Sequence, residues 1–219
     1  MGVRMIPFNS VADRLYRVVR LTAKELGNKA NLDIRGGQVE LDRSVLEKMI
    51  GPIEHLLRNA ITHGLEDVTQ RQTAGKPEIG EIALTLSQEG NEVVIDMTDD
   101  GAGLNFERIR SKAVEQGLLA PDQYPDEAAL TDFIFHAGFS TARELTEIAG
   151  RGVGMDVVKS ETAQLGGRIA VSSTPGKGAR FRIYLPLTLT VAQALLVRVG
   201  GRTYAIPSVM VEQVMELKE

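Results

Sequence analysis

The chain has 219 residues and a formal net charge of −4, and 43% of its residues are hydrophobic while 25% are charged. This balance is that of an ordinary globular protein with a buried core. The slightly acidic charge does not indicate nucleic acid as a partner. Because the sequence has no cysteine, disulfides, thiolate metal sites and cysteine nucleophiles are excluded. The sequence has neither an apolar run of membrane-spanning length nor a signal peptide, so we expect a cytoplasmic protein that is not inserted into a membrane.

The first half of the chain predicts helices and a hairpin. Apolar residues at helical spacing predict a helix over 8–27. Weak alternation on both sides of a Gly-Gly pair predicts a hairpin over 29–41. A second apolar stripe predicts a long helix over 42–64, in which Pro52 introduces a kink. The polar segment 65–78 is predicted to be a loop.

The second half predicts two strand pairs that enclose three helices. The ranges are 81–87 and 92–98 for the first strand pair, 106–117, 126–136 and 153–165 for the helices, and 168–173 and 179–185 for the second strand pair. Segment 137–151 is rich in Gly, Ser and Thr, and we expect it to be mobile. The elements together predict an α+β fold, a two-layer sandwich of a sheet with helices on one face.

The pattern changes after Pro186. Residues 187–219 read as strands and a hairpin, but this segment is too short to bury a core of its own. We therefore predict one domain over 1–186 and the truncated start of a second, β-rich domain over 187–219. Residues 3–7 read like the continuation of a longer protein.

The predicted helix over 42–64 carries polar side chains at helical spacings of three and four. His55, Arg58, Asn59, Thr62 and His63 therefore share one face. The carbonyl oxygen of an asparagine is a hard ligand that joins phosphate oxygens and water around Mg²⁺. Arginine and histidine side chains in such a face suit phosphates. The alternative is a solvated helix face with ordinary surface histidines.

Asp99 and Asp100 follow the predicted strand 92–98, and they are followed by Gly101 and Gly103. A carboxylate at a strand end can accept a hydrogen bond from the exocyclic amine of adenine. Guanine has a carbonyl at that position, so such a contact selects ATP over GTP. The glycines let a base lie against the backbone. The alternative is a polar turn, since Asp-Gly is common in turns.

Two glycine-rich stretches complete the set. In the first, Gly150, Gly152 and Gly154 lead directly into an amphipathic segment, and the N-terminus of a helix binds phosphate well. The second is a glycine turn with Gly178 that enters a strand. The first lacks the preceding strand and acidic partner of a dinucleotide fold and the Gly-Lys-Ser/Thr ending of a P-loop. The alternatives are a flexible loop and a plain hairpin.

These four motifs stand in the order found in the GHKL ATPases, a group that includes histidine kinases, gyrase, heat-shock chaperones and the MutL repair proteins. The segments 55–64, 99–103, 138–141, 150–159 and 185–190 further resemble CheA-type histidine kinases of chemotaxis, the last of them at the junction to a CheW-like domain. Related kinases of twitching-motility systems are equally consistent. The resemblance covers essentially the whole chain and implies the GHKL (Bergerat) fold. Residues 187–219 do not resemble the domains that follow in gyrase or MutL.

The resemblance implies a role for individual residues. It makes His55 and Asn59 catalytic, with His55 near the γ-phosphate and Asn59 as the Mg²⁺ ligand. Segment 137–151 would be a lid over ATP. Phe135 and Phe139 would lie in an aromatic box of the lid. The implied nucleotide contacts are Arg58, Asn59, Thr62, His63, Asp99, Gly101, Gly103, Phe139, Ser140, Thr141, Gly150, Arg151, Gly152, Val153, Gly154, Met155, Lys159 and Gly178.

The resemblance also implies an activity, transfer of the γ-phosphoryl group of Mg²⁺-ATP to a histidine on a separate phosphotransfer domain in a two-component phosphorelay. A response regulator and a CheW-like adaptor would be further partners, and the full-length protein would be a dimer through helices that this chain lacks. Two positions depart from the family's pattern, Thr62 where an acidic residue is usual and Ala179 where a threonine is usual. They leave open a catalytically weak nucleotide-binding scaffold.

Overall fold

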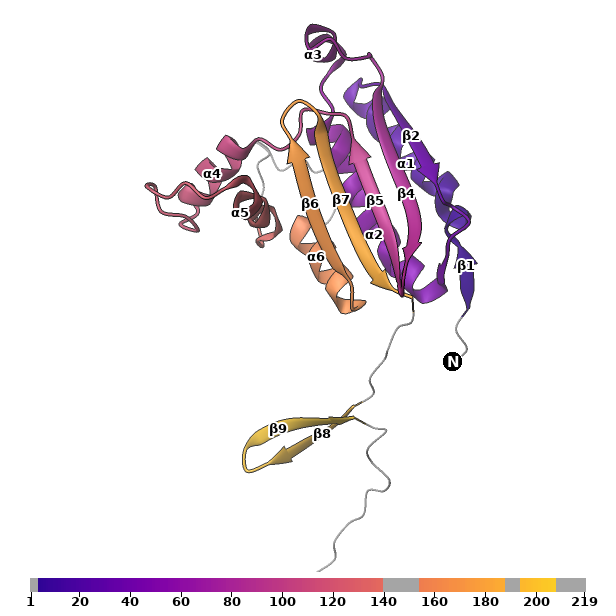
Figure 1. The fold of residues 1–219 in the computed structure, drawn as a ribbon, viewed down its shortest axis with the longest axis vertical. Coiled ribbons are helices and arrows are strands. Elements are labelled where there is room, and N and C mark those ends of the chain that lie inside the picture. The colour runs from indigo at the N-terminus through magenta and orange to yellow at the C-terminus, as the bar shows by residue number, and fades with distance from the viewer. Residues whose placement is uncertain (1–3, 140–153, 188–193, 208–219) are drawn as a thin grey trace, which may run out of the picture. The chain divides into compact units, whose positions relative to one another are not determined.

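The computed structural model describes residues 4–139, 154–187 and 194–207. The chain divides into two compact units, Met1–Leu187 and Thr188–Glu219 (Figure 1). The first unit contains a five-stranded sheet together with every helix among the described residues. No helix in these parts of the chain has the length and apolar character needed to cross a membrane.

The sheet of the first unit is mixed and has the order β2-β4-β5-β7-β6. Its strands are β2 (Ala30–Arg35), β4 (Gly80–Glu89), β5 (Glu92–Asp99), β6 (Arg168–Thr174) and β7 (Gly178–Pro186). Only β2 and β4 run parallel to each other, and the other neighbours are antiparallel. Side chains alternate across each strand, so Val93, Ile95 and Met97 of β5 are buried on one face. Asp99 continues that alternation and faces the same side.

Three helices cover the buried face of the sheet: α1 (Ala12–Leu26), α2 (Arg43–Asn59) and α6 (Met155–Gln164) (Figure 1). α1 contacts β2 and α2, and α2 also contacts α6. Their apolar stripes form the core against the sheet. Fully buried members of this core are Leu15, Leu46, Met49, Ile53, Leu56, Leu57 and Ile61. The predicted two-layer sandwich is therefore confirmed.

The remaining helices lie around the edges of the sandwich. α3 (Val68–Thr73) belongs to the connection between α2 and β4. α4 (Phe106–Glu115) and α5 (Glu127–Asp132) lie beyond β6 in Figure 1, and a 3-10 turn, Phe133–Phe135, continues α5 and contacts α6. The predicted helix over 8–27 is confirmed, with a 3-10 turn at Phe8–Val11 before α1.

Two predictions for the first half were wrong. The segment 29–41 is no hairpin, because β2 pairs with β4 while β3 (Glu40–Asp42) pairs with β1 (Met5–Pro7). These pairings join residues far apart in sequence, which local alternation does not reveal. The predicted loop over 65–78 contains α3. The long predicted helix is present, but α2 runs through Pro52 and ends at Asn59, after which the chain forms a π-helical turn.

Within the second unit, the described residues form the hairpin β8 (Ala194–Val199) and β9 (Arg202–Pro207). Gly200 and Gly201 join the two strands, and both have positive φ angles, 57° and 78°, which favour glycine. The expectation that this segment begins a β-rich, CheW-like domain stays a prediction.

Candidate functional site

The C-terminal end of α2 widens into a π-helical turn, Ala60–Gly64, that carries two of the predicted site residues, Thr62 and His63. Such turns insert a residue into a helix and occur frequently at functional sites. The carbonyl of Gly64 accepts a hydrogen bond from the N–H of Ala102 at 2.8 Å. This bond joins the end of α2 to the loop that follows β5. The turn therefore brings Thr62 and His63 near the strand end that carries Asp99.

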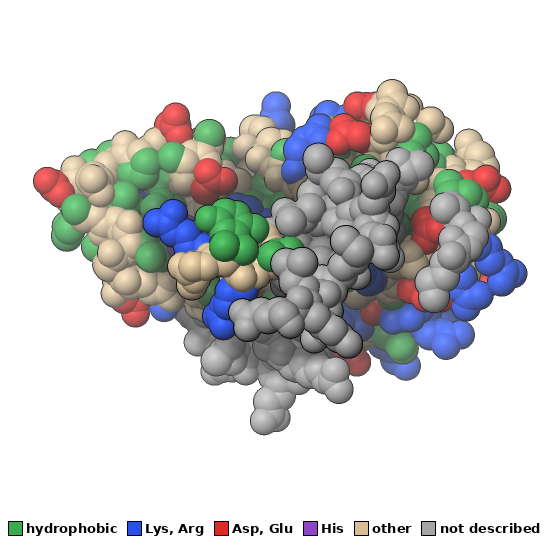
Figure 2. Space-filling view, turned by 90° about the horizontal axis from the view of Figure 1, so that it is seen from below, with side chains coloured by type: hydrophobic (Ala, Val, Ile, Leu, Met, Phe, Trp, Pro, Cys, Tyr) green, Lys and Arg blue, Asp and Glu red, His purple; other side chains and the backbone are tan. Residues whose placement is uncertain are grey.

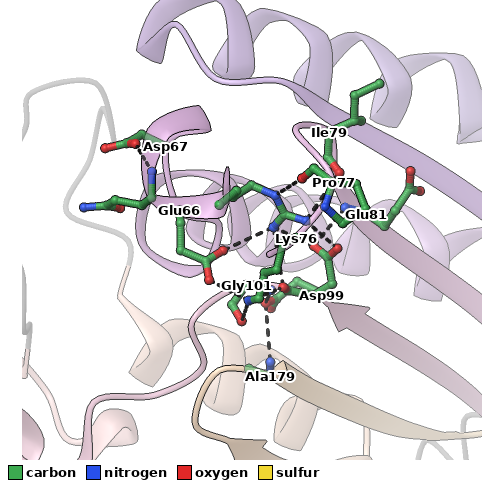
Figure 3. A network of polar contacts seen from close by, with 12 residues as sticks. Glu66, Asp67, Lys76, Pro77, Ile79, Glu81, Asp99, Gly101 and Ala179 are labelled. Carbon is green, nitrogen blue, oxygen red and sulfur yellow. Dashed lines mark hydrogen bonds and ion pairs between the residues drawn. The ribbon is translucent and has the colours of Figure 1, made fainter. Parts of the chain in front are cut away.

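Asp99 is the last residue of β5, and its side chain is only 7% exposed. Its Oδ1 accepts hydrogen bonds from the N–H of Gly101 at 2.9 Å and from the N–H of Ala179 at 3.4 Å (Figure 3). Its Oδ2 accepts none from the described residues, yet is not sealed from solvent. Burial raises the pKa of the Asp99 carboxyl above its ordinary value, although the Gly101 and Ala179 N–H groups oppose the shift.

Glycines allow three backbone segments to meet around this carboxylate. Gly178 has a φ of 93°, and a Cβ there would lie 1.8 Å from the backbone oxygen of Asp99. A Cβ on Gly101 would lie 2.0 Å from the carbonyl oxygen of Gly64. A Cβ on Gly64 would lie 3.3 Å from Oδ1 of Asp99 and narrow the space beside it. Side chains at these positions would displace the backbone that surrounds Asp99.

Gly103, the last glycine of the predicted adenine motif, also lies in a tight contact. Its φ is 78°, and a Cβ there would lie 2.8 Å from both Oγ of Ser173 and the carbonyl oxygen of Thr174. Oγ of Ser173 accepts from the N–H of Leu104 at 2.8 Å and donates to the carbonyl of Gly178 at 3.0 Å. The loop after β5 is thus fastened to the β6–β7 turn.

A buried arginine lies behind the site and was not predicted from the sequence. Arg71 of α3 is 1% exposed. Its guanidinium donates to both carboxylate oxygens of Asp100, at 3.1 and 2.7 Å, to Glu66 at 3.1 Å and to the carbonyl of Pro77 at 2.6 Å. Figure 3 shows this network around Glu66, Pro77 and Asp99. The planar guanidinium suits such a two-oxygen contact.

Lys76 adds a second connection to the same loop. Its ammonium group donates to the backbone carbonyls of Asp100 and Gly101, each at 2.8 Å. The carboxylate of Asp100 also accepts from the N–H of Glu81 at 2.9 Å. The segment between α2 and β4 therefore fixes the chain directly after Asp99. In the sequence, Arg71 and Lys76 are ordinary cations of a polar stretch, and only their burial distinguishes them.

Asn59 and His55 face the first turn of α6. The Asn59 Nδ2 lies 3.0 Å from Nε2 of His55 and donates to the sulfur of Met155 at 3.5 Å. With the amide nitrogen used in this way, Oδ1 of Asn59 has no hydrogen-bond partner among the described residues. Met155 is the first residue of α6, and Gly154 is its N-cap, so free N–H groups of a helix start lie beside Asn59.

Both predicted site histidines favour the neutral form. Burial lowers the pKa of His55 most, and the positive charges of Arg58 and His63 lower it further, while Asp156 opposes them. The pKa of His63 is lowered as well. Partial loss of contact with water is the main cause, and the positive charge of Arg108 adds to it. A neutral histidine can accept a hydrogen bond through one ring nitrogen.

The other predicted residues within the described ranges differ in their burial and contacts. Arg58 is half-buried and Thr62 is exposed, and neither makes a hydrogen bond to the described residues. Phe139 is buried and stacks on Phe133, with 6.4 Å between ring centres. The Lys159 ammonium lies 5.0 Å from the ring centre of Phe135. The predictions for Ser140, Thr141, Gly150, Arg151, Gly152 and Val153 lie outside the described residues.

In the described parts of the chain, no group of three or more His, Asp or Glu side chains is suited to a metal ion. Near Asn59 lie its own Oδ1, Nε2 of His55 and the N-terminus of α6. Mg²⁺ keeps several water ligands and binds through one or two protein oxygens together with the phosphates of a substrate. A single amide oxygen next to the N-terminus of a helix fits that pattern.

A family model described as "Histidine kinase-, DNA gyrase B-, and HSP90-like ATPase" matches residues 50–189. The chain is 44% identical over 207 residues to the chemotaxis protein CheA of Treponema pallidum (strain Nichols), which covers 94% of this chain and 26% of that protein. It is 41% identical over 216 residues to CheA of Rhizobium meliloti (strain 1021), which covers 99% of this chain and 28% of that protein. The chain thus spans about a quarter of the length of these relatives.

The fold also resembles a solved structure, the nucleotide-free catalytic domain of the histidine kinase ThkA. The TM-score is 0.51 at 15% sequence identity, over 86% of this chain and 97% of that domain. At this identity the likeness concerns the fold alone.

Proposed function

The chain belongs to the family of histidine kinase-, DNA gyrase B- and HSP90-like ATPases, and on that basis we propose that it is the ATP-binding catalytic part of a CheA-type histidine kinase. The observation that carries the proposal is the buried carboxylate of Asp99, which keeps one oxygen free of hydrogen bonds to the described residues while glycine backbone packs closely around it.

Adenine fits this carboxylate. Oδ2 of Asp99 accepts a hydrogen bond from the exocyclic amine, and Gly64 has no side chain that would crowd this carboxylate. A guanine carbonyl at the same place would face a carboxylate, which costs free energy because two acceptors meet without a proton. The base side of the site therefore selects ATP over GTP.

The phosphates extend toward α2 and α6. The N-terminus of α6 attracts phosphate through its free N–H groups, and Oδ1 of Asn59 serves as a ligand of Mg²⁺ together with phosphate oxygens and water. Arg58 and His63 lie on the same face of α2 and its π-helical turn and contact phosphates there. Mg²⁺-ATP supplies the γ-phosphoryl group to be transferred.

The side chains act by position and charge. Phosphoryl transfer requires alignment of the attacking and leaving oxygens or nitrogens and neutralisation of developing charge more than covalent help from the protein. The lowered pKa of His55 leaves its ring neutral near pH 7, so it can accept a hydrogen bond close to the γ-phosphate. His55 orients the reacting groups in this role.

The acceptor is a histidine of a separate phosphotransfer domain. The chain has three histidines, of which His55 and His63 belong to the site and His136 lies next to its aromatic cluster. The relatives named chemotaxis protein CheA support a two-component phosphorelay with a response regulator and a CheW-like adaptor. A chemotaxis and a twitching-motility pathway both fit, and we expect the protein to act in the cytoplasm.

The alternative is a nucleotide-binding scaffold that transfers no phosphate. It is suggested by Thr62 and Ala179, the two positions that depart from the family's pattern. The contact that Ala179 makes to Asp99 comes from its backbone N–H, which a threonine would offer equally. The loss of that hydroxyl therefore leaves the base contact in place, and the kinase is favoured.

The test is a phosphotransfer assay with γ-labelled ATP, Mg²⁺ and an isolated histidine phosphotransfer domain of a CheA-type relative. The proposal predicts acid-labile label on that domain, and none when Asn59→Ala replaces the wild-type chain. A chain that binds ATP in calorimetry but transfers no label to any phosphotransfer domain tested would support the scaffold instead. If Thr62→Asp then restored transfer, the departure at that position would be the cause.

A further inference from the structure

β2 is an edge strand of the five-stranded sheet. It pairs with β4, and no other described strand lies along its second edge. The carbonyl of Lys29 accepts from the N–H of Gly80 on the β4 side. Because the backbone groups of successive strand residues point to opposite edges, those of Ala30, Leu32 and Ile34 point away from β4. Such unpaired groups are a template for another strand.

A groove runs along this free edge. Its volume is about 510 Å³, and five consecutive residues, Asn28 to Leu32, line it. The last three, Ala30 to Leu32, belong to β2, whose side chains alternate between the two faces of the sheet, so a groove that all three line meets the strand at its backbone edge. The opposite wall is a single stripe of α1 at helical spacing, Tyr16, Val19, Arg20 and Ala23. The groove thus separates one helix from the unpaired edge of one strand.

Part of the lining of the groove is apolar. Val19 and Leu32 are buried, whereas Tyr16 is 41% exposed and Ile79 is 47% exposed. Tyr16 and Ile79 therefore offer apolar surface that the side chains of a bound segment would cover. Grouped exposure of this kind is typical of a binding surface rather than of scattered surface residues.

The charged residues that line the groove are all cations. Arg20, Lys24 and Lys29 line it, and no carboxylate does. Lys29 pairs with Glu78 at 2.7 Å, but Arg20 and Lys24 form no ion pair with the described residues. Figure 2, a view from below, shows a separate group of Lys and Arg side chains at the lower right, at the end of the sheet away from the groove. The chain as a whole has a net charge of −4, so the local excess at the groove runs against the average.

We propose that this groove binds an extended acidic segment of a partner protein, which adds as a strand to the free edge of β2. The partner's backbone pairs with the outward groups of Ala30 and Leu32, its apolar side chains cover Tyr16 and Ile79, and its carboxylates face Arg20 and Lys24. Main-chain pairing gives the affinity in this mode of recognition, and the pockets and charges give the specificity. The site is separate from Asp99 and Asn59, so it does not depend on the proposed function.

The first experiment uses the whole chain and a fluorescent peptide of alternating glutamate and valine, with a lysine–valine peptide as a control. The glutamate peptide should bind with a Kd below about 1 mM, the range of weak peptide docking, and the lysine peptide should not. Amide hydrogen exchange should slow at Ala30 and Leu32 when the glutamate peptide is bound, because their N–H groups become paired. Exchange at β2 that does not change would overturn the strand addition even if the peptide bound.

Variants separate strand pairing from simple charge attraction. The double charge reversal Arg20→Glu with Lys24→Glu should weaken binding at least about fivefold, since rim attraction becomes repulsion. Arg17→Glu reverses an exposed charge on the same helix outside the groove, and it should change the Kd less than about twofold. Equal losses for the two changes would overturn the proposed location.

Ala30→Pro removes an outward N–H at the first residue of the strand, a position where proline is tolerated. It should weaken binding of the glutamate peptide at least about fivefold, while the melting temperature and the affinity for ADP stay as in the wild type. Unchanged peptide affinity in a folded Ala30→Pro chain would contradict strand addition. A short single-stranded oligonucleotide that displaced the peptide and was itself insensitive to Ala30→Pro would identify a general polyanion surface and would also contradict the proposal.

Discussion

The carboxylate proposed to bind the base and the amide proposed to bind the metal are supported in different ways. Asp99 is buried and accepts hydrogen bonds from two backbone N–H groups. The next residue, Asp100, is held in place by Arg71 and Lys76. Asn59 has two side-chain contacts, at 3.0 and 3.5 Å. A polar group fixed by buried neighbours is preorganised, and a loosely held one must be ordered when the ligand binds. We therefore infer that the base side of the site is formed in the free protein.

The largest expected effect comes from Arg71→Met, because it leaves the carboxylates of Asp100 and Glu66 without their buried partner. We expect the free energy of unfolding to fall by about 3 kcal/mol or more, measured by urea denaturation. Arg180→Met is the matched control, since Arg180 also pairs with an aspartate, Asp96, but is 49% exposed. This control should cost less than about 1 kcal/mol. Equal losses in the two variants would mean that burial of Arg71 adds nothing.

Gly178→Ala should have the next largest effect. Its positive φ and the 1.8 Å approach of a Cβ to the Asp99 backbone both oppose a side chain. We expect a loss of about 2–4 kcal/mol in unfolding free energy, from backbone strain together with the displaced strand end, and a weaker affinity for adenosine. Gly176→Ala in the same turn has a φ of 76° but open space around it, so it should cost only the strain, about 1 kcal/mol. Adenosine affinity that is lost in both variants alike would contradict the close packing on Asp99.

Asp99→Asn should separate affinity from stability. The loss of a hydrogen bond to a charged acceptor should weaken ADP binding by about 1.5–3 kcal/mol. This corresponds to about a 10- to 150-fold increase in Kd, measured in a competition assay. Because burial raises the pKa of Asp99, the stability linked to this group is fully present below about pH 3.9 and is lost as the pH rises through its folded-state pKa. At pH 7 the neutral asparagine should therefore leave the chain at least as stable as the wild type. A variant that is much less stable at pH 7 would show that Asp99 is structural.

Asn59→Ala should affect only the phosphate side. We expect Mg²⁺-ATP to bind about five- to tenfold more weakly, the range of one ordinary hydrogen bond or ligand contact, and adenosine to bind as before. Isothermal calorimetry with both ligands makes the comparison. If adenosine lost affinity to the same degree as ATP, the two sides of the site would not be independent.

The smallest effect concerns pH. Burial lowers the pKa of His55 and His63, so the stability linked to them is present above their unfolded value of about 6.5 and is lost as the pH falls through their folded-state pKa values. The double variant His55→Gln with His63→Gln lacks this loss. The difference in melting temperature, variant minus wild type, should therefore increase as the pH is lowered from 8 to 5. A difference that stays constant over this range would contradict the direction of both shifts.

The sequence predicts more of the site than of its support. Asp99, Gly101 and Gly178 are recognisable because a carboxylate at a strand end and glycines in turns are local patterns. The segment 29–41 was wrongly predicted to be a hairpin, because β2 pairs with β4 about fifty residues further along the chain. Arg71 was missed for a related reason, since its partners Glu66 and Asp100 come together only through the fold. Burial of a cation has no signature in a single sequence.

The central claim is that Asp99 forms an adenine site before any phosphate or metal binds. Calorimetric titration of the wild-type chain with adenosine and with guanosine, both without Mg²⁺, tests it most directly. The account predicts measurable binding of adenosine and at least about tenfold weaker binding of guanosine, because the guanine carbonyl would face a carboxylate. Equal affinities for the two nucleosides, or adenosine binding that appears only with Mg²⁺ and phosphates present, would contradict it.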